Sequence, residues 1–362
     1  MRIDVIDCYQ AFLDLRPNWD AVYAADDDAN WFLSWTFMSI WLAKTQAPET
    51  KHSEGWFILA VHGDDPAFRY VAFFPLRKRQ RRTIKGADYI ELAMGGRKYA
   101  DYTGIICLPG YRDAAVEMFL GHIKSQEWML WCLECLRLPD GEIDRWLMRF
   151  PPQEFEIRQL KTVNSGEETR QDICPFVTLP RDWPSYLDTR LSANTRQKLR
   201  RVLRQVEGSN CLRITHASGE TIERDIKILL HLWRTKWRDA KGERLNSMLQ
   251  LIGSMLMGAY RTGSLFLPIL WHDRTPVGAL GCFVDSEKGT MLFVIGARDE
   301  TYDGPPPGHV LHAHSIRTAI GEGLRTYDFL RGNEPYKYSF GAAERRLANL
   351  VIMRRRARAI PL

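Results

Sequence analysis

The sequence lacks the features that mark several large protein classes. Its seven cysteines, an odd number at irregular spacing in 362 residues, argue against a disulfide framework. It contains no low-complexity tract, and its apolar (45%) and charged (26%) fractions exclude collagen-like and wholly disordered chains. The longest apolar stretches, residues 31–43 and 245–260, are too short or too interrupted to cross a bilayer, so we predict no membrane insertion.

Several short signatures are also missing. The sequence has no GxxxxGK[ST], strand-linked GxGxxG, GxSxG or HExxH motif, which removes the main ATPase, dinucleotide, esterase and zinc-protease interpretations. Cys132 and Cys135 form a CxxC, but residues 128–138 have a strand pattern that places the two thiols on opposite faces, so we expect neither a redox pair nor a metal there. The start, MRIDVIDCYQ, has early acids and no apolar segment, which predicts a cytoplasmic protein without a signal peptide.

What the sequence does have is a mild excess of positive charge. The formal net charge is +6, which fits an anionic ligand such as a phosphorylated cofactor, a nucleotide-linked sugar or RNA. The basic residues concentrate in two runs, 77–85 and 196–204, and helical spacing brings Arg196, Arg200 and Arg204 together in the second. Such runs are either solvated faces or contacts for a polyanion, and the sequence leaves both open.

The chain divides at one polar segment. Residues 161–172, KTVNSGEETRQD, read as a linker and predict two domains, 1–165 and 173–362. In the first, Trp31, Trp35, Met38 and Trp41 recur at helical spacing and predict core packing. In the second, three helices (191–207, 221–237 and 245–262) precede three antiparallel strands (265–271, 277–284 and 291–296), a helix at 309–322 and strands at 326–330 and 347–354. The expected fold class is α/β, with helices beside mixed sheets.

The junction at residues 304–310 is the first candidate site. The segment GPPPGHV leads into a helix, whose free N–H groups and positive dipole end favour an anion, so Gly308 and Val310 are candidates for cofactor binding. The alternative is a proline-rich turn without function. His309 and His312 share a helix face, but no third ligand stands at a suitable spacing, so we predict no metal. We expect His309 to contact substrate, and His312 and His314 to be structural.

The second candidate site is the segment DFLRGNEPYK, which follows a strand. Strand alternation would place Asp328 and Leu330 on one face. Lys337 suits a phosphate, a carboxylate or an oxyanion, and Glu334 suits a general base. The competing interpretation is a structural ion-pair network of Asp328, Arg331 and Lys337.

The second half resembles the CelD/BcsL-like acetyltransferases of the GNAT (N-acetyltransferase) superfamily. The resemblance covers roughly residues 178–355 and rests on SANTRQKLRRVLRQVE, LLHLWRTKWRDAKG, PPPGHVLHAHSIRTAIGEG and, most specifically, YDFLRGNEPYKYSFG. It implies two tandem GNAT-like domains, as in FemAB/FemX-type aminoacyl transferases, each with a twisted, mostly antiparallel sheet, the first degenerate. The family's [RQ]xxGx[GA] pyrophosphate loop is absent, because 303–308 reads DGPPPG.

The resemblance implies transfer of an acyl group from acetyl-CoA or another acyl-CoA to an amine or hydroxyl of a cell-surface polysaccharide or amino-sugar precursor. The predicted catalytic residues are Glu334 as base, Tyr336 as the acid for the leaving thiolate, Lys337, and Asp328, which would orient Arg331 or Lys337. Arg331 and His309 would bind substrate. Two alternatives remain open: a FemAB-like transferase that uses aminoacyl-tRNA, motivated by the basic runs, and a non-catalytic scaffold for polysaccharide synthesis, motivated by the proline-filled loop.

Overall fold

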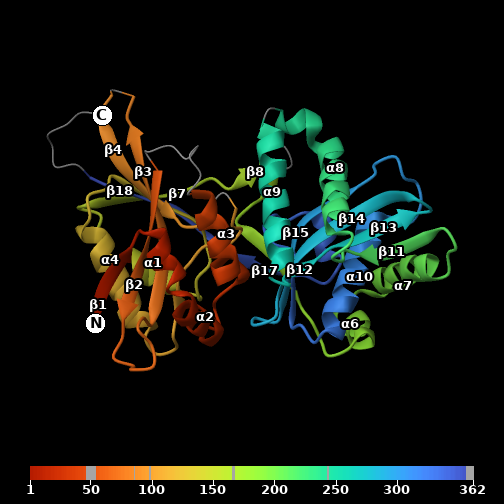
Figure 1. The fold of residues 1–362 in the computed structure, drawn as a ribbon, viewed down its shortest axis with the longest axis horizontal. Helices are drawn as coiled ribbons and strands as arrows, with labels where there is room; N and C mark the ends of the chain where they lie inside the picture. Colours follow the sequence, from red (N-terminus) through yellow and green to blue (C-terminus); the bar gives the residue numbers. More distant parts are fainter. Residues whose placement is uncertain (46–53, 85, 98, 165–167, 243, 356–362) are drawn as a thin grey trace. The chain divides into compact units, whose positions relative to one another are not determined.

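The computed structural model describes residues 1–45, 54–84, 86–97, 99–164, 168–242 and 244–355, and they form two compact units (Figure 1). The first unit is Met1–Asp172 with the segment that begins at Arg346, and the second is Ile173–Arg345. The predicted α/β class is confirmed. Residues 165–167 of the expected linker and Lys85 of the first basic run lie outside the described residues.

The first unit is built around a mixed sheet. The strand order is β1-β2-β3-β4-β6-β18-β7, with β5 pairing to β3. Its elements are β1 (Arg2–Ile6), α1 (Tyr9–Leu13), α2 (Arg16–Ala25), η1 (Trp31–Leu33), α3 (Trp35–Thr45), β2 (Glu54–His62), β3 (Ala72–Arg82), β4 (Asp88–Met94), β5 (Ile106–Cys107), α4 (Arg112–Ser125), β6 (Leu130–Leu136), α5 (Glu142–Leu147), β7 (Phe155–Gln159), the hairpin β8 (Val163–Asn164) and β9 (Thr169–Arg170), and β18 (Ala348–Arg354).

The second unit repeats this plan with more helix. Its strand order is β11-β13-β14-β15-β16-β10-β17, with β12 pairing to β14. Its elements are β10 (Ile173–Thr178), α6 (Trp183–Arg190), α7 (Ala193–Glu207), β11 (Leu212–His216), α8 (Ile222–Lys241), α9 (Arg244–Arg261), β12 (Leu265–Phe266), β13 (Pro268–His272), β14 (Thr275–Asp285), β15 (Thr290–Arg298), α10 (Pro307–Gly321), β16 (Thr326–Asp328), α11 (Pro335–Tyr338) and β17 (Ala343–Arg346). The three predicted antiparallel strands and the predicted helix after them are confirmed.

The first unit takes one strand from the segment that follows the second unit in the sequence. β18 comes last in the chain, yet it pairs antiparallel with β6 and β7 in the first unit. β10 directly follows the first unit in sequence and pairs antiparallel with β16 in the second. The predicted second domain, 173–362, is therefore wrong at its carboxyl end, because the pairing of β18 outweighs its position in the sequence.

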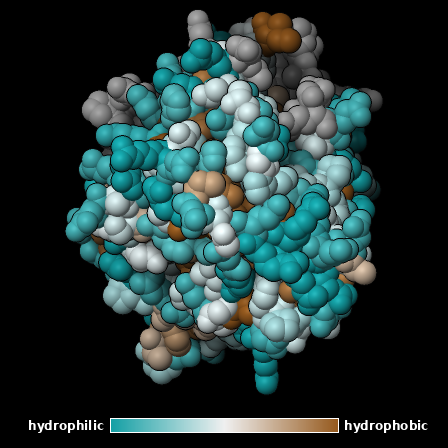
Figure 2. Space-filling view, turned by 90° about the vertical axis from the view of Figure 1, so that its right-hand side faces the viewer, coloured by the Kyte–Doolittle hydropathy of each residue, from teal (hydrophilic) through white to brown (hydrophobic). Residues whose placement is uncertain are grey.

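Packing explains why these segments fold as they do. The predicted aromatic stripe is core: Trp31, Trp35, Met38 and Trp41 are all buried. In α7, the buried Leu199, Val202, Leu203 and Val206 follow helical spacing, and the Ser192 side chain caps the helix by accepting the Thr195 N–H. Polar side chains cover most of the face in Figure 2, with apolar ones in small groups, as expected when helices turn apolar sides inward.

Helix α10 is buried on nearly every side. It packs against β14, β15 and α7, and nine of its residues are buried, among them Val310, His312 and Ile316. It ends at Gly321, and two residues later Gly323 has the positive φ of 73° and the N–H bond to the Ile320 carbonyl that are typical of the glycine predicted to end this helix. A helix held this firmly gives its first turn a fixed position.

Candidate functional site

The two central strands of the second unit separate. β15 and β16 run parallel and pair only from Thr290 to Leu292 and from Thr326 to Asp328. β15 continues to Arg298, whereas β16 ends and the next residue, Phe329, donates its N–H to the Pro175 carbonyl of β10. Beyond Leu292, the edge of β15 that pairs with β16 has no partner strand among the described residues. Its backbone N–H and C=O groups are therefore available to a ligand.

A pocket of about 310 Å³ lies where the strands separate. Its floor is apolar, from β14, β15 and α10, and three basic side chains stand among the lining residues: Lys236, Arg298 and His309. The complete lining is Lys236, Leu280, Phe293, Gly296, Ala297, Arg298, Gly308, His309, Leu311, His312 and Tyr336. An apolar cavity with a few polar and cationic groups is the usual form of a small-molecule site.

The first turn of α10 contributes backbone donors to this pocket. Pro306 and Pro307 have no N–H, and the N–H of Val310 already bonds the Pro306 carbonyl, so Gly308 and His309 hold the available donors. A side chain at Gly308 would meet no atom within 4 Å. The predicted anion site therefore keeps Gly308. Val310, also predicted to bind the cofactor, is fully buried and is not among the residues that line the pocket.

His309 lies among positive charges. Burial lowers its pKa, and the charges of Lys198 and Arg298 lower it further. The Lys198 Nζ is 3.5 Å from the His309 Nε2. The imidazole is therefore neutral at physiological pH and can accept a proton.

Tyr336 is the one residue of the predicted YK pair that lines the pocket. The residue is 36% exposed, so most of its surface is covered by the protein. This burial and the charge of Glu334 raise the pKa of its phenol. The phenol thus keeps its proton at neutral pH and can donate it. Its predicted role as an acid remains a prediction.

Lys337 has a different position from the one predicted. It is 2% exposed, and its Nζ donates to the carbonyl oxygens of Arg331 and Gly332, both at 2.9 Å, and lies 2.8 Å from Glu334 Oε2. Neither Lys337 nor Glu334 lines the pocket. The ammonium stabilises the loop before α11, in which Leu330 has a positive φ of 56°, and so fixes the position of Tyr336.

Asp328 is also part of this support. Its carboxylate is buried, accepts the Leu330 N–H at 2.8 Å and binds the Arg345 guanidinium at 3.1 Å. The expected strand alternation of Asp328 and Leu330 is wrong, because β16 ends at Asp328. Asp328 and Arg331 do not line the pocket. Of the eight predicted site residues, the structure brings together Gly308, His309 and Tyr336 there.

Sequence reasoning missed Lys236, Arg298, Phe293 and His312. His312 had a signal, its i,i+3 spacing from His309, which places both rings on one face. Lys236 lies far away in the sequence on α8, and no spacing indicated it. Within the described ranges, no group of three or more His, Cys, Asp or Glu side chains could hold a metal ion.

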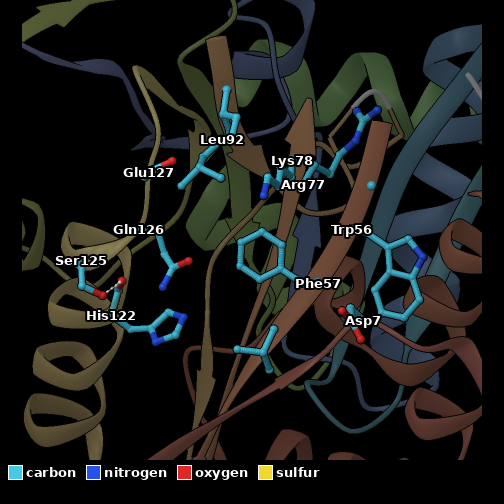
Figure 3. A pocket seen from close by; sticks show the side chains of 13 residues that line it. Asp7, Trp56, Phe57, Arg77, Lys78, Leu92, His122, Ser125, Gln126 and Glu127 are labelled. Carbon is cyan, nitrogen blue, oxygen red and sulfur yellow. Dashed lines mark hydrogen bonds between the residues drawn. The ribbon is translucent and has the colours of Figure 1, made fainter. Parts of the chain in front are cut away.

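A larger groove of about 820 Å³ lies in the first unit (Figure 3). It runs over the sheet face from Phe57 and Lys78 to His122 and Gln126 at the carboxyl end of α4. The second-unit pocket, by contrast, lies at the amino end of its helix. The groove is thus not the counterpart of that pocket.

The two basic runs have different surroundings. In the first, Arg77 and Arg79 of β3 are buried, so neither belongs to a solvated face. Arg79 binds Glu91 at 2.8 Å, and Arg77 is among the residues that line the first-unit groove. In the second, Arg196, Arg200 and Arg204 line a groove of about 640 Å³ with Arg317 of α10. Asp188 and Glu207 pair with Arg196 and Arg317, and neutralise part of this charge.

Comparison with known proteins agrees with this arrangement. Residues 193–338 match the family model of the acetyltransferase (GNAT) domain. A crystal structure of FemX is similar over 96% of each chain, with 8% identity and a TM-score of 0.64. A conserved protein of unknown function from Bacteroides thetaiotaomicron VPI-5482 is similar over 97% of this chain and 99% of its own, with 12% identity and a TM-score of 0.55. The search of curated proteins found no match.

Among the described residues, no helix combines the length and apolar character needed to cross a membrane. All residues that line the second-unit pocket, from Lys236 to Tyr336, lie within the matched segment. The chain thus has the overall fold of FemX, and its second unit carries the segment that matches the GNAT acetyltransferase domain.

Proposed function

We propose that the second unit transfers an acyl group from acetyl-CoA or another acyl-CoA to an amine or hydroxyl. One observation carries the proposal: the pocket lies where β15 leaves β16 and where α10 begins. The apolar floor suits the thioester arm of the donor. Lys236, Arg298 and the N–H groups of Gly308 and His309 suit its phosphates, because a helix start favours anions.

The proposed reaction is direct attack within a ternary complex. His309 takes the proton of the attacking amine or hydroxyl, and Tyr336 protonates the departing thiolate. Bringing donor and acceptor together supplies much of the acceleration. Glu334, Lys337, Asp328 and Arg331 act as positioning residues through the loop that presents Tyr336, in place of the direct roles expected from the sequence.

The acceptor class rests on the resemblance to CelD/BcsL-like acetyltransferases. The segment YDFLRGNEPYKYSFG, which carries that resemblance, contains Tyr336 of the pocket. We therefore propose a cell-surface polysaccharide or amino-sugar precursor as acceptor.

Calorimetric titration of the full chain with acetyl-CoA tests the donor. The double variant Lys236→Ala, Arg298→Ala should weaken binding at least about tenfold, since it removes two charges from the pocket. Lys227→Ala, an exposed lysine on the same helix, should bind as the wild type does. Absence of binding by the wild-type chain would contradict the proposal and favour the non-catalytic scaffold.

A second candidate, transfer from aminoacyl-tRNA, is favoured by the arginine groove between α7 and α10. Phosphate contacts make affinity fall steeply with salt. Charged tRNA should then bind with a log–log salt slope that Arg200→Ala, Arg204→Ala makes shallower. Binding that does not depend on salt, or no binding, would exclude tRNA as the donor.

A further inference from the structure

His312 is a buried polar side chain with one ring nitrogen unsatisfied. It is 3% exposed, lines the second-unit pocket, and its Nδ1 lies 2.9 Å from the Tyr327 hydroxyl. Across the described parts of the chain, this is the only hydrogen bond of the ring, and its other neighbours are aromatic, with Phe293 at 4.6 Å and Tyr336 at 5.6 Å between centroids. The Nε2 atom is not fully enclosed by protein atoms, so a ligand in the pocket can supply its hydrogen-bond partner.

Tyr327 determines which ring nitrogen carries the proton. Burial raises the pKa of the Tyr327 phenol well above its usual value, so the hydroxyl always has a proton to donate. The acceptors near it are the His312 Nδ1 and the Cys282 sulfur, 4.0 Å away, and a thiol is the weaker acceptor. The Ser315 hydroxyl is also close to the phenol, yet within the described residues it has no hydrogen-bond partner. The phenol therefore donates to Nδ1, and the His312 proton resides on Nε2.

The ring stays uncharged at working pH. Burial lowers the pKa of His312 to about 3, and the nearby charges of Lys337 and His309 act in the same direction. Such a weak base cannot take the proton of an acceptor group, a task that suits the more accessible His309. What His312 offers is a fixed, neutral N–H donor, and its complement is an oxygen atom.

We propose that the Nε2–H of His312 is a catalytic donor that binds the acyl oxygen of the thioester while transfer takes place. The inference rests on the proposed function. The lone pair of the amine or hydroxyl forms a bond to the carbonyl carbon, and the C=O pair moves onto oxygen, where the His312 N–H holds it. The pair then returns, the C–S bond breaks, and the electrons leave with sulfur, which receives the proton delivered by Tyr336. His312 keeps its proton throughout.

Turnover of acetyl-CoA by the full chain, followed as release of free thiol with water as the acceptor, measures this role. Loss of one oxyanion donor lowers kcat by about 10²–10³-fold. We expect that loss in His312→Phe with KM within about threefold, and partial recovery, to within about tenfold of wild type, in His312→Gln, which restores a side-chain N–H. His314→Gln, on the same helix but bonded to His216, is the matched control and should keep wild-type rates.

Nitrogen NMR of labelled imidazoles shows which ring nitrogen of His312 carries the proton, a property that a purely structural role of His312 would not link to kcat. The wild type should show the Nε2–H tautomer of His312, and Tyr327→Phe should lose that preference and reduce kcat about tenfold. If His312→Phe does not fold, His312→Gln and Tyr327→Phe carry the test. Wild-type kcat in His312→Phe, or an Nδ1–H tautomer in the wild type, overturns the donor role alone. Failure of the wild type to bind acetyl-CoA overturns the proposed function and this role together.

Discussion

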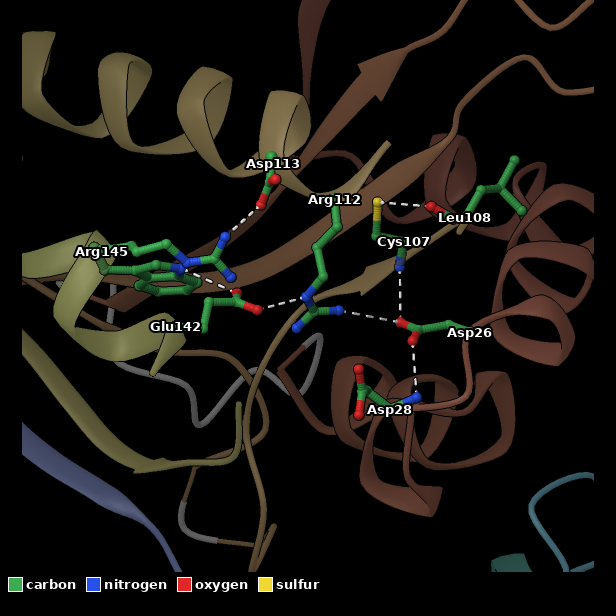
Figure 4. Close-up of polar contacts among 9 residues, drawn as sticks. Asp26, Asp28, Cys107, Leu108, Arg112, Asp113, Glu142 and Arg145 are labelled. Carbon is green, nitrogen blue, oxygen red and sulfur yellow. Dashed lines mark hydrogen bonds and ion pairs between the residues drawn. The ribbon is translucent and has the colours of Figure 1, made fainter. Parts of the chain in front are cut away.

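The two units build the same motif, a strand, a helix and a parallel strand, and differ in what meets the start of the helix. In the second unit, Gly308, the second residue of α10, lies on a pocket. In the first, α4 opens with Arg112, whose guanidinium lies 2.6 Å from Glu142 and 3.8 Å from Asp26, both buried (Figure 4). Trp146 adds a hydrogen bond to Glu142. The helix start of the first unit is thus occupied by its own charged network.

The parallel strand pairs of the two units, β4 with β6 and β15 with β16, differ in the same way: the space beside them is filled in the first unit and open in the second. β4 pairs with β6 over three residues, and Thr103 then continues the pairing: its N–H bonds the Cys135 carbonyl and its carbonyl accepts the Arg137 N–H, both at 2.9 Å. In the second unit the corresponding place, beyond Leu292 of β15, borders the pocket. In the first unit, the Thr103 segment fills the space between the two parallel strands, and the unit serves as a structural support. In the second unit, the same space stays open and forms the pocket. We propose that the first unit is the degenerate one.

The largest effect that tests this comparison concerns Arg112. Arg112→Leu leaves Glu142 and Asp26 buried without their cation, and breaking such a pair costs about 3–5 kcal/mol. Urea unfolding should show this loss, while kcat of the folded fraction should stay as in the wild type. The control is Arg145→Leu, whose pair with Asp113 at 2.7 Å is exposed and should contribute less than about 1 kcal/mol. A stable Arg112→Leu protein, or one with a lower kcat, would break the comparison.

The next effect compares the second residue of each helix. Gly308→Trp places a large side chain in open space at the pocket, so acetyl-CoA turnover should fall about 10²-fold, because small displacements of reacting groups are costly. Asp113→Trp, at the equivalent position of α4, should leave turnover unchanged, since Asp113 is exposed. Equal losses in the two variants would mean that both helix starts serve the reaction.

Much of the fold follows from local patterns, whereas the site depends on long-range contacts. The proline-rich segment before α10 and the three apolar runs of β13 to β15 predicted those elements, because these features are local in the sequence. The pairing of β18 with β6 was not predictable, since no local property of 348–354 selects one sheet over another.

The site shows the same limit. Gly308, His309 and Tyr336 were found through a helix start and a motif, which are local features. Lys337 was assigned to substrate because an isolated lysine after a strand suits an anion, yet two carbonyl groups and Glu334 surround it in the fold. His312 was assigned a structural role because its spacing alone does not reveal the cavity beside it.

The two units should also respond to acid in opposite directions. Burial lowers the pKa of His314 in the second unit to about 4, from 6.5 when unfolded, so the unfolded chain takes up protons first. The associated stability is complete above pH 6.5 and is lost as pH falls towards 4, by roughly 2 kcal/mol at pH 5. Burial raises the pKa of Asp26 in the first unit, so its carboxyl favours the folded state as pH falls.

Hydrogen exchange measured separately for peptides of α10 and α2 between pH 5 and 7.5 checks these signs. Protection should fall with acid in α10 more than in α2. His314→Gln should make the α10 profile shallower, and the slope that stays comes from His312, whose pKa burial also lowers. Asp26→Asn should act on α2 alone. Parallel profiles in the two helices would show that these groups do not govern the response to pH.

The smallest effect concerns the hydroxyl of Thr103. Its Oγ1 donates to the Glu134 carbonyl at 2.7 Å, and the residue is 1% exposed, so Thr103→Val should cost about 1 kcal/mol in urea unfolding by leaving that carbonyl unsatisfied. Thr189→Val removes the same kind of bond, to the Ser185 carbonyl at 2.7 Å, from an exposed helix and should cost less, because water replaces the donor. Turnover should be unchanged in both, since the Thr103 segment fills a gap that has no part in the reaction. A lower kcat in Thr103→Val would instead mean that the Thr103 segment of the first unit affects the reaction in the second-unit pocket.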